Sequence, residues 1–211
     1  MNSRIPKQFL LLGGLPVLMR TVRAFYLFNP GMLIILALPE SYTAYWQDLC
    51  SKYNFKIRHS IVTGGDSRYQ SVKNALEAVP DDFIVAIHDG VRPLVSQKTI
   101  TNVFEEAEKN GNAIPVIPVN ESIRKVEKGG NKPVSRDQFR IVQTPQAFNA
   151  KAIKDAYAKT EPIDFTDDAT VFESTGGKIF LVEGNPENIK ITQPSDLMFA
   201  ESIILRTSLS D

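Results

Sequence analysis

The run Met32-Leu33-Ile34-Ile35-Leu36-Ala37-Leu38 is continuously apolar. Because its residues do not alternate with polar ones, it predicts a strand that is buried on both faces of a parallel sheet. The segment before it, Leu15 to Phe28, carries apolar residues at helical spacing and predicts a helix. Asn29-Pro30-Gly31 breaks the chain between the two segments. This helix and this strand begin a pattern that decides the fold.

The same alternation of strands and helices continues along the chain. Further strands are expected at His59 to Val62, Phe83 to Ile87, Asn112 to Val119 and Lys178 to Val182. Further helices are expected at Ser41 to Tyr53, Ser67 to Ala78, Ser96 to Asn110, Lys151 to Ala158, Asp167 to Ser174 and Pro194 to Leu205. Such a pattern predicts an α/β fold with a mostly parallel sheet. A chain of 211 residues suits one substantial core, so residues 1–211 are expected to form a single domain.

The stretch 119–143 interrupts this pattern. Ser122 to Val126 alternates weakly, and Glu127 to Pro133 is a polar turn before the apolar residues return. This is typical of a β-hairpin arm with little core of its own. Since an isolated hairpin is marginally stable in water, we expect the arm to pack on a second subunit. A solvent-exposed hairpin is the alternative, and the low apolar content of the arm leaves it open.

Composition excludes several classes of protein. The 24 Lys and Arg residues balance the 24 Asp and Glu residues, so the chain has no net positive charge that would favour binding to nucleic acid or to an acidic membrane. Cys50 is the single cysteine, which excludes an internal disulfide and a thiolate metal cluster. The apolar runs are too short to span a bilayer, and no secretory signal is evident in the sequence. The expected location is the cytoplasm.

Polar clusters follow several of the expected strands, where open α/β sheets bind their ligands. The first is Gly64-Gly65-Asp66-Ser67-Arg68, with Ser71 one turn into the next helix. Glycines let a ligand approach the backbone, and a helix start offers free N–H groups. An ordinary glycine turn with a helix cap is the alternative interpretation.

The second cluster is His88-Asp89-Gly90-Val91-Arg92-Pro93. Asp89 can hold a metal ion or a sugar hydroxyl, and the fork of Arg92 fits phosphate oxygens. A local ion pair between these two residues is the alternative. His88 is interpreted as a packed structural histidine.

The third cluster lies in the loop from Glu183 to Thr192, where Lys190 stands between two isoleucines. That setting indicates a positioned cation, although a surface lysine with a buried stem is the alternative.

Thr144 and Thr166 lie in two further loops and supply hydroxyls; a helix cap is the alternative role of Thr166. Lysine, arginine, glycine and threonine recur, which indicates anion handling and phosphoryl or nucleotidyl transfer. Neither a set for acyl transfer nor a zinc-binding spacing is present.

These motifs, together with Pro6-Lys7-Gln8-Phe9, resemble the 2-C-methyl-D-erythritol 4-phosphate cytidylyltransferases of the non-mevalonate isoprenoid pathway. The other matching segments are Gly64 to Arg68 with Ser71, His88 to Pro93, Gln143 to Gln146, Thr166 to Ala169 and Asn188 to Thr192. Each motif is weak evidence alone, but together they follow the order found in the family and span nearly the whole chain. The resemblance implies a Rossmann-like nucleotidyltransferase fold with a mostly parallel sheet and a protruding β-arm.

The resemblance also implies an activity and a set of roles. The family joins CTP to methylerythritol phosphate, releases pyrophosphate, and needs Mg²⁺ held largely by the nucleotide phosphates. By resemblance, Lys7 and Lys190 would stabilise the charge that builds during transfer. The nucleotide would be bound by Gly65, Asp66, Ser71 and Asp89. The second substrate would be bound by Arg92, Thr144 and Thr166.

In this family the β-arm reaches across a homodimer and completes the partner's site. Ser122 and Arg136 stand at the matching positions. The family usually has threonine where Ser122 stands; since the hydroxyl is kept, we expect the change to be tolerated.

The family also begins with a strand and a glycine-rich loop that would precede Met1. We expect that segment to be encoded just upstream; without it, triphosphate binding and turnover should be severely impaired. Two other functions stay open: a cytidylyltransferase for ribitol 5-phosphate, and a non-catalytic nucleotide-binding or dimerisation protein.

Overall fold

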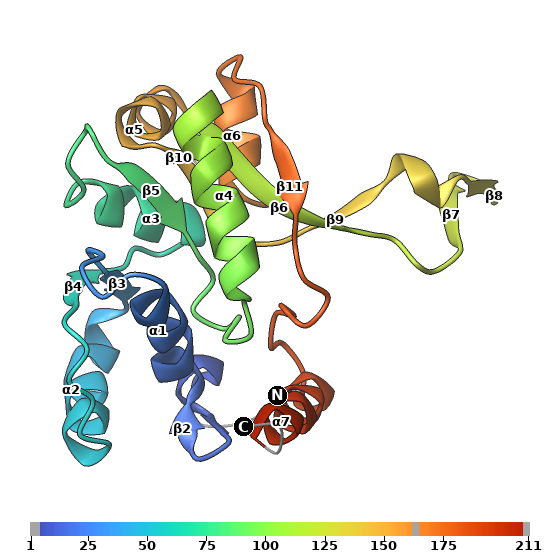
Figure 1. Ribbon diagram of the computed structural model, residues 1–211. Coiled ribbons are helices and arrows are strands. Elements are labelled where there is room, and N and C mark those ends of the chain that lie inside the picture. The colour runs from blue at the N-terminus through green and yellow to red at the C-terminus, as the bar shows by residue number, and fades with distance from the viewer. Residues whose placement is uncertain (1–4, 162–164, 209–211) are drawn as a thin grey trace.

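The computed structural model describes residues 5–161 and 165–208 (Figure 1). The expected α/β fold is confirmed, and most elements lie within a few residues of their predicted bounds. The N-terminal part contains η1 (Lys7–Phe9), β1 (Leu11–Leu12), β2 (Leu15–Pro16), α1 (Val17–Phe28), β3 (Ile35–Leu38), η2 (Glu40–Tyr42), α2 (Thr43–Lys52) and β4 (Ser60–Thr63).

The continuously apolar run forms β3, which pairs in parallel with β4. The strand is shorter than predicted because its ladder with β4 begins only at Ile35, opposite Ser60. Helices α1 and α2 pack with these strands around Trp46, which is fully buried. This part of the molecule therefore has a core of its own.

A second sheet has the order β11–β6–β10–β5, and β9 pairs with β6 as well. Its strands are β5 (Ile84–Ile87), β6 (Asn112–Pro118), β9 (Arg140–Val142), β10 (Gln146–Asn149) and β11 (Leu181–Glu183). Strand β11 is parallel to β6, whereas β10 is antiparallel to both β5 and β6. No strand was predicted at β10, so the parallel pattern expected from the sequence becomes a mixed sheet.

Helices cover both faces of the second sheet (Figure 1). They are α3 (Arg68–Leu76), α4 (Gln97–Asn110), α5 (Ala150–Lys159) and α6 (Asp168–Ser174), and the remaining helix is α7 (Pro194–Ser208). Because successive strand residues point to opposite faces, Ala147 packs against α4 while Phe148 packs against α5 and α6. Helix α7 lies apart from these, next to β1, where Leu12 and Ala200 share a small core.

The arm extends away from the body of the molecule (Figure 1). It consists of β7 (Ile123–Glu127), β8 (Gly130–Val134) and η3 (Arg136–Gln138). Strands β7 and β8 pair only with one another among the residues that the structure describes. Val126 near the tip is 81% exposed, so the hairpin forms as predicted but without a core within its own chain.

The carboxyl ends of β4 and β5 meet at one edge of the molecule. Arg68, which opens the helix after β4, lies 3.7 Å from Asp89, which follows β5. Since β3 is parallel to β4, all three strands end at this edge. No helix within the described ranges is both long and apolar enough to cross a lipid bilayer.

Candidate functional site

The carboxylate of Asp89 is the centre of a cluster of cations. Its Oδ2 lies 3.1 Å from the Lys190 ammonium and 3.1 Å from Nε of Arg92, while Oδ1 lies 3.7 Å from Arg68. Burial alone would raise the pKa of Asp89, but the fields of Lys190, Arg68 and Arg92 outweigh it and hold the pKa below its ordinary value. Asp89 is therefore ionised at neutral pH. Because Lys190 and Arg92 share this carboxylate, one positive charge among the three side chains is left for an anionic ligand.

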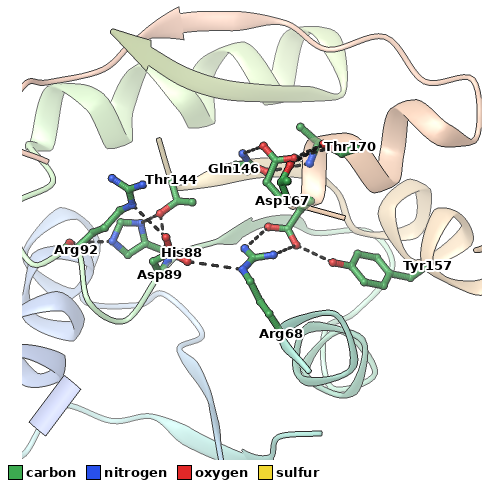
Figure 2. Close-up of polar contacts among 12 residues, drawn as sticks. Arg68, His88, Asp89, Arg92, Thr144, Gln146, Tyr157, Asp167 and Thr170 are labelled. Atoms are coloured by element: carbon green, nitrogen blue, oxygen red, sulfur yellow. Dashed lines mark hydrogen bonds and ion pairs between the residues drawn. The ribbon is translucent and has the colours of Figure 1, made fainter. Parts of the chain in front are cut away.

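The loop that carries Asp89 is fixed by a second set of contacts (Figure 2). The Thr144 hydroxyl accepts a hydrogen bond from the Asp89 backbone N–H at 3.1 Å and lies 3.0 Å from Nδ1 of His88. The other ring nitrogen of His88 lies 3.0 Å from the Arg92 carbonyl oxygen. Burial lowers the pKa of His88 to about 4, so the ring is neutral and serves the loop as a structural element. The interpretation of His88 as a packed histidine agrees with this geometry.

Arg68 joins Asp89 to a buried carboxylate on a different helix (Figure 2). Its guanidinium donates two hydrogen bonds to Asp168, at 3.0 and 2.6 Å. Asp168 is fully buried and accepts a third hydrogen bond, from the Tyr157 hydroxyl at 2.7 Å. Desolvation by burial disfavours the charge on Arg68, but the bonds to Asp168 more than compensate and raise the pKa of Arg68. The guanidinium therefore remains charged beside Asp89.

Asp89 and the three cations around it line a cavity of about 260 Å³. It brings together five of the residues that the sequence singled out: Asp89, Arg92, Thr144, Thr166 and Lys190. Thr166 is exposed at its rim, and the cap of α6 is Asp167, whose side chain accepts from the Thr170 N–H at 2.9 Å. The alternative role of Thr166 as the helix cap is therefore wrong.

Gly65, Asp66 and Ser71 form a neighbouring cluster at the start of α3. The Gly65 N–H donates to the Ser71 hydroxyl at 3.0 Å, and that hydroxyl donates to the Ser67 carbonyl oxygen at 2.8 Å. A Cβ added at Gly65 would lie 2.2 Å from Cγ of Gln70, so the turn has no room for a larger residue. Asp66 is exposed. The structure brings these three residues together, but none of them lines the 260 Å³ cavity. Arg68, in the first turn of the same helix, does line it.

Lys7 and the two arm residues lie outside this cavity. Lys7 is half-buried in η1. Backbone hydrogen bonds from Thr192 and Gln193 are the main reason that the pKa of Asp196 is lowered, and the charge of Lys7 adds to that shift. Lys7 therefore lies near the segment that follows Lys190. Ser122 and Arg136 are exposed on the arm, where Arg136 donates to the Asn120 carbonyl oxygen, and neither residue lines the cavity of its own chain.

Sequence reasoning missed several residues that build the site. The sequence patterns contain Arg68 only as one member of a motif, and they predict no role for Asp168, Tyr157 or Asn188. Asn188 is fully buried; its side chain donates to the Thr144 carbonyl oxygen at 2.7 Å, and its own carbonyl oxygen accepts from Arg92 at 2.7 Å. Arg68, Asp168 and Asn188 lie within the sequence motifs described above, and this position in a motif is the one signal that could have identified them. Tyr157 lies outside these motifs. The pairings themselves join segments up to 100 residues apart.

The arrangement can bind a multiply charged anion beside groups that accept hydroxyl hydrogen bonds. Lys190 is partly exposed, with 45% of its side-chain surface open to solvent, and it faces the cavity next to Asp89. An incoming phosphate can replace Asp89 as its partner without breaking a buried pair. The described residues contain no group of three or more histidine, cysteine or carboxylate side chains that could hold a metal ion.

Comparisons with known proteins agree on one family. The family model described as "IspD: 2-C-methyl-D-erythritol 4-phosphate cytidylyltransferase" matches residues 1–206. The protein named 2-C-methyl-D-erythritol 4-phosphate cytidylyltransferase from Phocaeicola vulgatus is 50% identical over 204 residues, which cover 97% of this chain and 93% of that protein. The protein of the same name from Bacteroides fragilis is 48% identical over 204 residues, with the same coverage of both chains.

Solved structures are similar over almost the whole chain. The crystal structure of 2-C-methyl-D-erythritol 4-phosphate cytidylyltransferase from Thermus thermophilus superimposes with a TM-score of 0.82 at 32% identity, over 95% of this chain and 94% of that one. The 4-diphosphocytidyl-2C-methyl-D-erythritol synthase from Anaerococcus prevotii superimposes with a TM-score of 0.83 at 28% identity, over 93% and 88% of the two chains.

Proposed function

This chain belongs to the IspD family of 2-C-methyl-D-erythritol 4-phosphate cytidylyltransferases, and we propose that it transfers a cytidylyl group from CTP to 2-C-methyl-D-erythritol 4-phosphate in isoprenoid precursor biosynthesis. An oxygen of the methylerythritol phosphate attacks the α-phosphorus of CTP. The bond from that phosphorus to the β-phosphate oxygen breaks, and pyrophosphate leaves with both electrons of the bond. The observation that carries the proposal is the cavity in which Lys190 and Arg92 share the single carboxylate of Asp89.

Lys190 and Lys7 are the proposed catalytic residues. Negative charge grows on the oxygens of the α-phosphorus and on the leaving pyrophosphate, so cations that are already in place lower the barrier. Lys190 supports this role because it is partly exposed, faces the cavity and is oriented by Asp89 at 3.1 Å. Lys7 supports it because its charge acts on Asp196, six residues beyond Lys190.

The nucleotide is proposed to lie between the two clusters. The turn at Gly65, which is fixed by the hydrogen bond to the Ser71 hydroxyl, and the exposed Asp66 beside it are proposed to contact the base. Asp89 accepts hydrogen bonds from ribose hydroxyls. Arg92, Thr144 and Thr166, which all line the 260 Å³ cavity, then bind the methylerythritol phosphate through one guanidinium and two hydroxyls.

Mg²⁺ is proposed as the metal that accompanies CTP. Magnesium typically keeps several waters and binds to substrate phosphates with one or two carboxylates. The donor set here fits that mode, because two carboxylates, Asp89 and Asp167, line the cavity in which the substrate phosphates would lie. When bound, the metal would neutralise charge on the phosphate oxygens of the nucleotide.

The arm is proposed to reach the site of a second copy in a homodimer. Ser122 and Arg136 are exposed and do not line the cavity of their own chain, and β7 and β8 lack a core among the described residues of their own chain. An isolated hairpin is marginally stable, so contact with a partner would explain why the arm keeps its structure. We also place the protein in the cytoplasm, because CTP is a cytoplasmic nucleotide.

Pyrophosphate release tests this function directly. The protein is mixed with CTP and Mg²⁺ and offered either 2-C-methyl-D-erythritol 4-phosphate or ribitol 5-phosphate. We expect release with the first polyol and at least tenfold slower release with the second, a gap that corresponds to ~1.4 kcal/mol. Faster turnover of ribitol 5-phosphate would reassign the substrate. Binding of CTP in calorimetry without release from either polyol would support a non-catalytic protein instead.

A further inference from the structure

Gln143 lies where the strand that returns from the arm reaches the body of the molecule. It follows β9 directly, and its backbone N–H donates to the Pro115 carbonyl oxygen of β6 at 2.9 Å. The residue is only 3% exposed, although its side chain carries two polar groups. Since buried amides in native proteins have hydrogen-bond partners, the partners of this side chain indicate what Gln143 does.

The side chain of Gln143 crosses the face of strand β6. Val116 of β6 pairs with Val142 of β9 on one edge and with Glu183 of β11 on the other, so β9 and β11 lie on opposite sides of β6. Nevertheless, Nε2 of Gln143 donates to the carbonyl oxygen of Asn185, just beyond the end of β11, at 2.9 Å. This bond holds the loop after β11 to the end of the strand that returns from the arm.

Gly184 leaves the space that this crossing needs. A Cβ added at Gly184 would lie 2.4 Å from Oε1 of Gln143 and 3.4 Å from Cγ2 of Ile117. The φ angle of Gly184 is outside the left-handed region, so the close approach of the Gln143 side chain, and not the backbone conformation, explains why a glycine stands here. The loop after β11 is thus shaped around Gln143.

The carbonyl group of the Gln143 side chain faces Asn188 in the same loop. Nδ2 of Asn188 donates to the Thr144 carbonyl oxygen at 2.7 Å and to Oε1 of Gln143 at 3.4 Å. Asn188 is fully buried, and its Oδ1 has no hydrogen-bond partner in the described part of the chain. The side chain of Asn188 is therefore held through its N–H groups, and these point to residues 143–144.

Asn188 connects this junction to Arg92 and Lys190, which both line the 260 Å³ cavity. The backbone carbonyl oxygen of Asn188 accepts a hydrogen bond from Nη1 of Arg92 at 2.7 Å, and Lys190 follows Asn188 by two residues. A shift of Asn188 would therefore displace both the acceptor of Arg92 and the backbone that carries Lys190. Because electrostatic stabilisation of a phosphate needs cations that are already in place, such a displacement weakens it.

We propose that Gln143 is a positioning residue that fixes Arg92 and Lys190 for phosphate binding and transfer. Its Nε2 holds the start of the loop at Asn185, and its Oε1 holds the middle of the loop at Asn188. The kinetic part of this inference rests on the proposed function, which assigns Lys190 to charge stabilisation. The geometric part does not, because binding of pyrophosphate to the same cations is measured without turnover.

The test compares Gln143→Met with a matched variant of a second buried amide. Methionine keeps the length of the side chain and removes both of its polar groups. Asn112 of β6 is also 3% exposed; it donates to the Lys178 carbonyl oxygen at 2.9 Å and accepts from the Phe180 N–H at 3.1 Å. Asn112→Leu therefore removes two hydrogen bonds between β6 and the segment before β11, and Asn112 does not line the cavity.

Calorimetry with inorganic pyrophosphate gives the first readout. We expect Gln143→Met to bind pyrophosphate about fivefold more weakly than the parent chain, because the cations are no longer preorganised. Asn112→Leu should bind it with the parent affinity. A smaller folded fraction would lower the stoichiometry of binding and leave the affinity unchanged, so a merely structural role is distinguished. Parent affinity in Gln143→Met, or equal weakening in both variants, would overturn the proposal.

Gly184→Ala provides a second way to displace the Gln143 side chain. The added methyl group would meet Oε1 of Gln143, so the side chain must move although its amide remains. We expect pyrophosphate binding to weaken as in Gln143→Met, and parent affinity in Gly184→Ala would overturn the proposal. Near-ultraviolet circular dichroism confirms that each variant is folded before its affinity is compared.

Steady-state pyrophosphate release gives the second readout. The kcat of Gln143→Met should fall about tenfold, because a small misplacement of catalytic groups slows the reaction, while Asn112→Leu should keep the parent kcat. Turnover with an unchanged kcat in Gln143→Met would overturn the proposal. If neither polyol phosphate supports release, the proposed function fails, and the pyrophosphate affinities still decide whether Gln143 positions the cations.

Discussion

Arg68 and Asp168 form a bidentate ion pair that joins the first turn of α3 to the first turn of α6, with N–O distances of 3.0 and 2.6 Å (Figure 2). Parallel hydrogen bonds between a guanidinium and a carboxylate are among the strongest and most directional in proteins. Asp168 is fully buried, and the start of a helix favours its negative charge. The pair therefore sets the position from which Arg68 reaches Asp89.

Replacement of Asp168 by asparagine should destabilise the protein. The change leaves Arg68 without its charge partner and replaces one acceptor oxygen by an amide. We expect a loss of about 2 kcal/mol in unfolding free energy, below the ~3–5 kcal/mol for a fully buried pair, because the Arg68 side chain is 37% exposed and screened by water. Urea unfolding measures the loss. Tyr157→Phe, which removes only one hydrogen bond to the same carboxylate, should cost less; an equal or greater cost would assign the stability to the hydroxyl.

Lys190→Gln should reduce turnover while the fold remains intact. If the ammonium stabilises charge on the transferring phosphorus, its removal lowers kcat about 100-fold or more. The matched control is Lys98→Gln, because Lys98 is 77% exposed and contacts Glu183 on the surface. Steady-state pyrophosphate release compares the two. A change confined to KM in Lys190→Gln would make Lys190 a binding residue and not a catalytic one.

Asp89→Asn should affect anion binding and turnover in opposite directions. Without the carboxylate, Lys190 and Arg92 lose their shared counter-charge, so calorimetry should show about five- to tenfold tighter binding of pyrophosphate. Turnover should fall because a hydroxyl acceptor is lost. Asp155→Asn, which removes a surface partner of Lys151, should change neither quantity. Weaker pyrophosphate binding in Asp89→Asn would mean that Asp89 mainly orients the cations.

His88 should make the protein less stable in mild acid. Burial lowers the pKa of the folded-state ring to about 4 from an ordinary value of 6.5, so the unfolded chain takes up a proton over a range in which the folded chain does not. Its stabilising contribution is therefore complete above pH 6.5 and is lost as the pH falls toward 4. The charged and polar groups that face the ring are Asp89, Arg92 and Thr144, and Phe25 packs against it.

Urea unfolding of the parent chain and of His88→Gln across this range measures the effect. Between pH 6.5 and 4 the parent should lose up to about 3 kcal/mol more than the variant. Parallel pH profiles for the two proteins would show that His88 titrates normally in the fold.

Mixing two inactive variants should restore activity if the arm serves a partner. Lys190→Gln damages the body of the site and Arg136→Ala damages the arm. After co-refolding, a mixed dimer contains one site with an intact body and an intact arm, so about a quarter of the original activity should return. The control pair, Lys190→Gln with Asp89→Asn, damages the same body twice and should restore nothing. Equal activity from both mixtures would argue against a shared site.

The apolar spacing of the helices and of most strands, including the interior strand β6, is a local signal, so the sequence predicts them. It failed at β10, whose four residues Gln146–Asn149 begin and end with polar side chains. That strand is buried because it enters between β5 and β6, which lie far from it in sequence. Only the tertiary packing could reveal it, and with it the mixed character of the sheet.

The site was predictable residue by residue but not as a geometry. The motif around Asp89 and Arg92 indicated an anion site, and their local pair is present at 3.1 Å. The pairing of Arg68 with Asp168 depends on how α3 and α6 meet, which no spacing in the sequence encodes. Likewise, the arm was recognised from its turn, but the position of Arg136 relative to the cavity follows from the direction in which the hairpin leaves the sheet.

The cluster at Gly65 and the cluster at Asp89 are anchored to different sheets. On heating, the two parts of the site should therefore lose their structure one after the other. Gly65 follows β4, whereas Asp89 follows β5, and within the described residues no backbone ladder connects β3 to β5. Segments joined mainly by side chains open before segments joined by ladders. On gentle heating the chain should therefore lose its discrimination between cytosine and other bases while it still binds an inorganic polyphosphate.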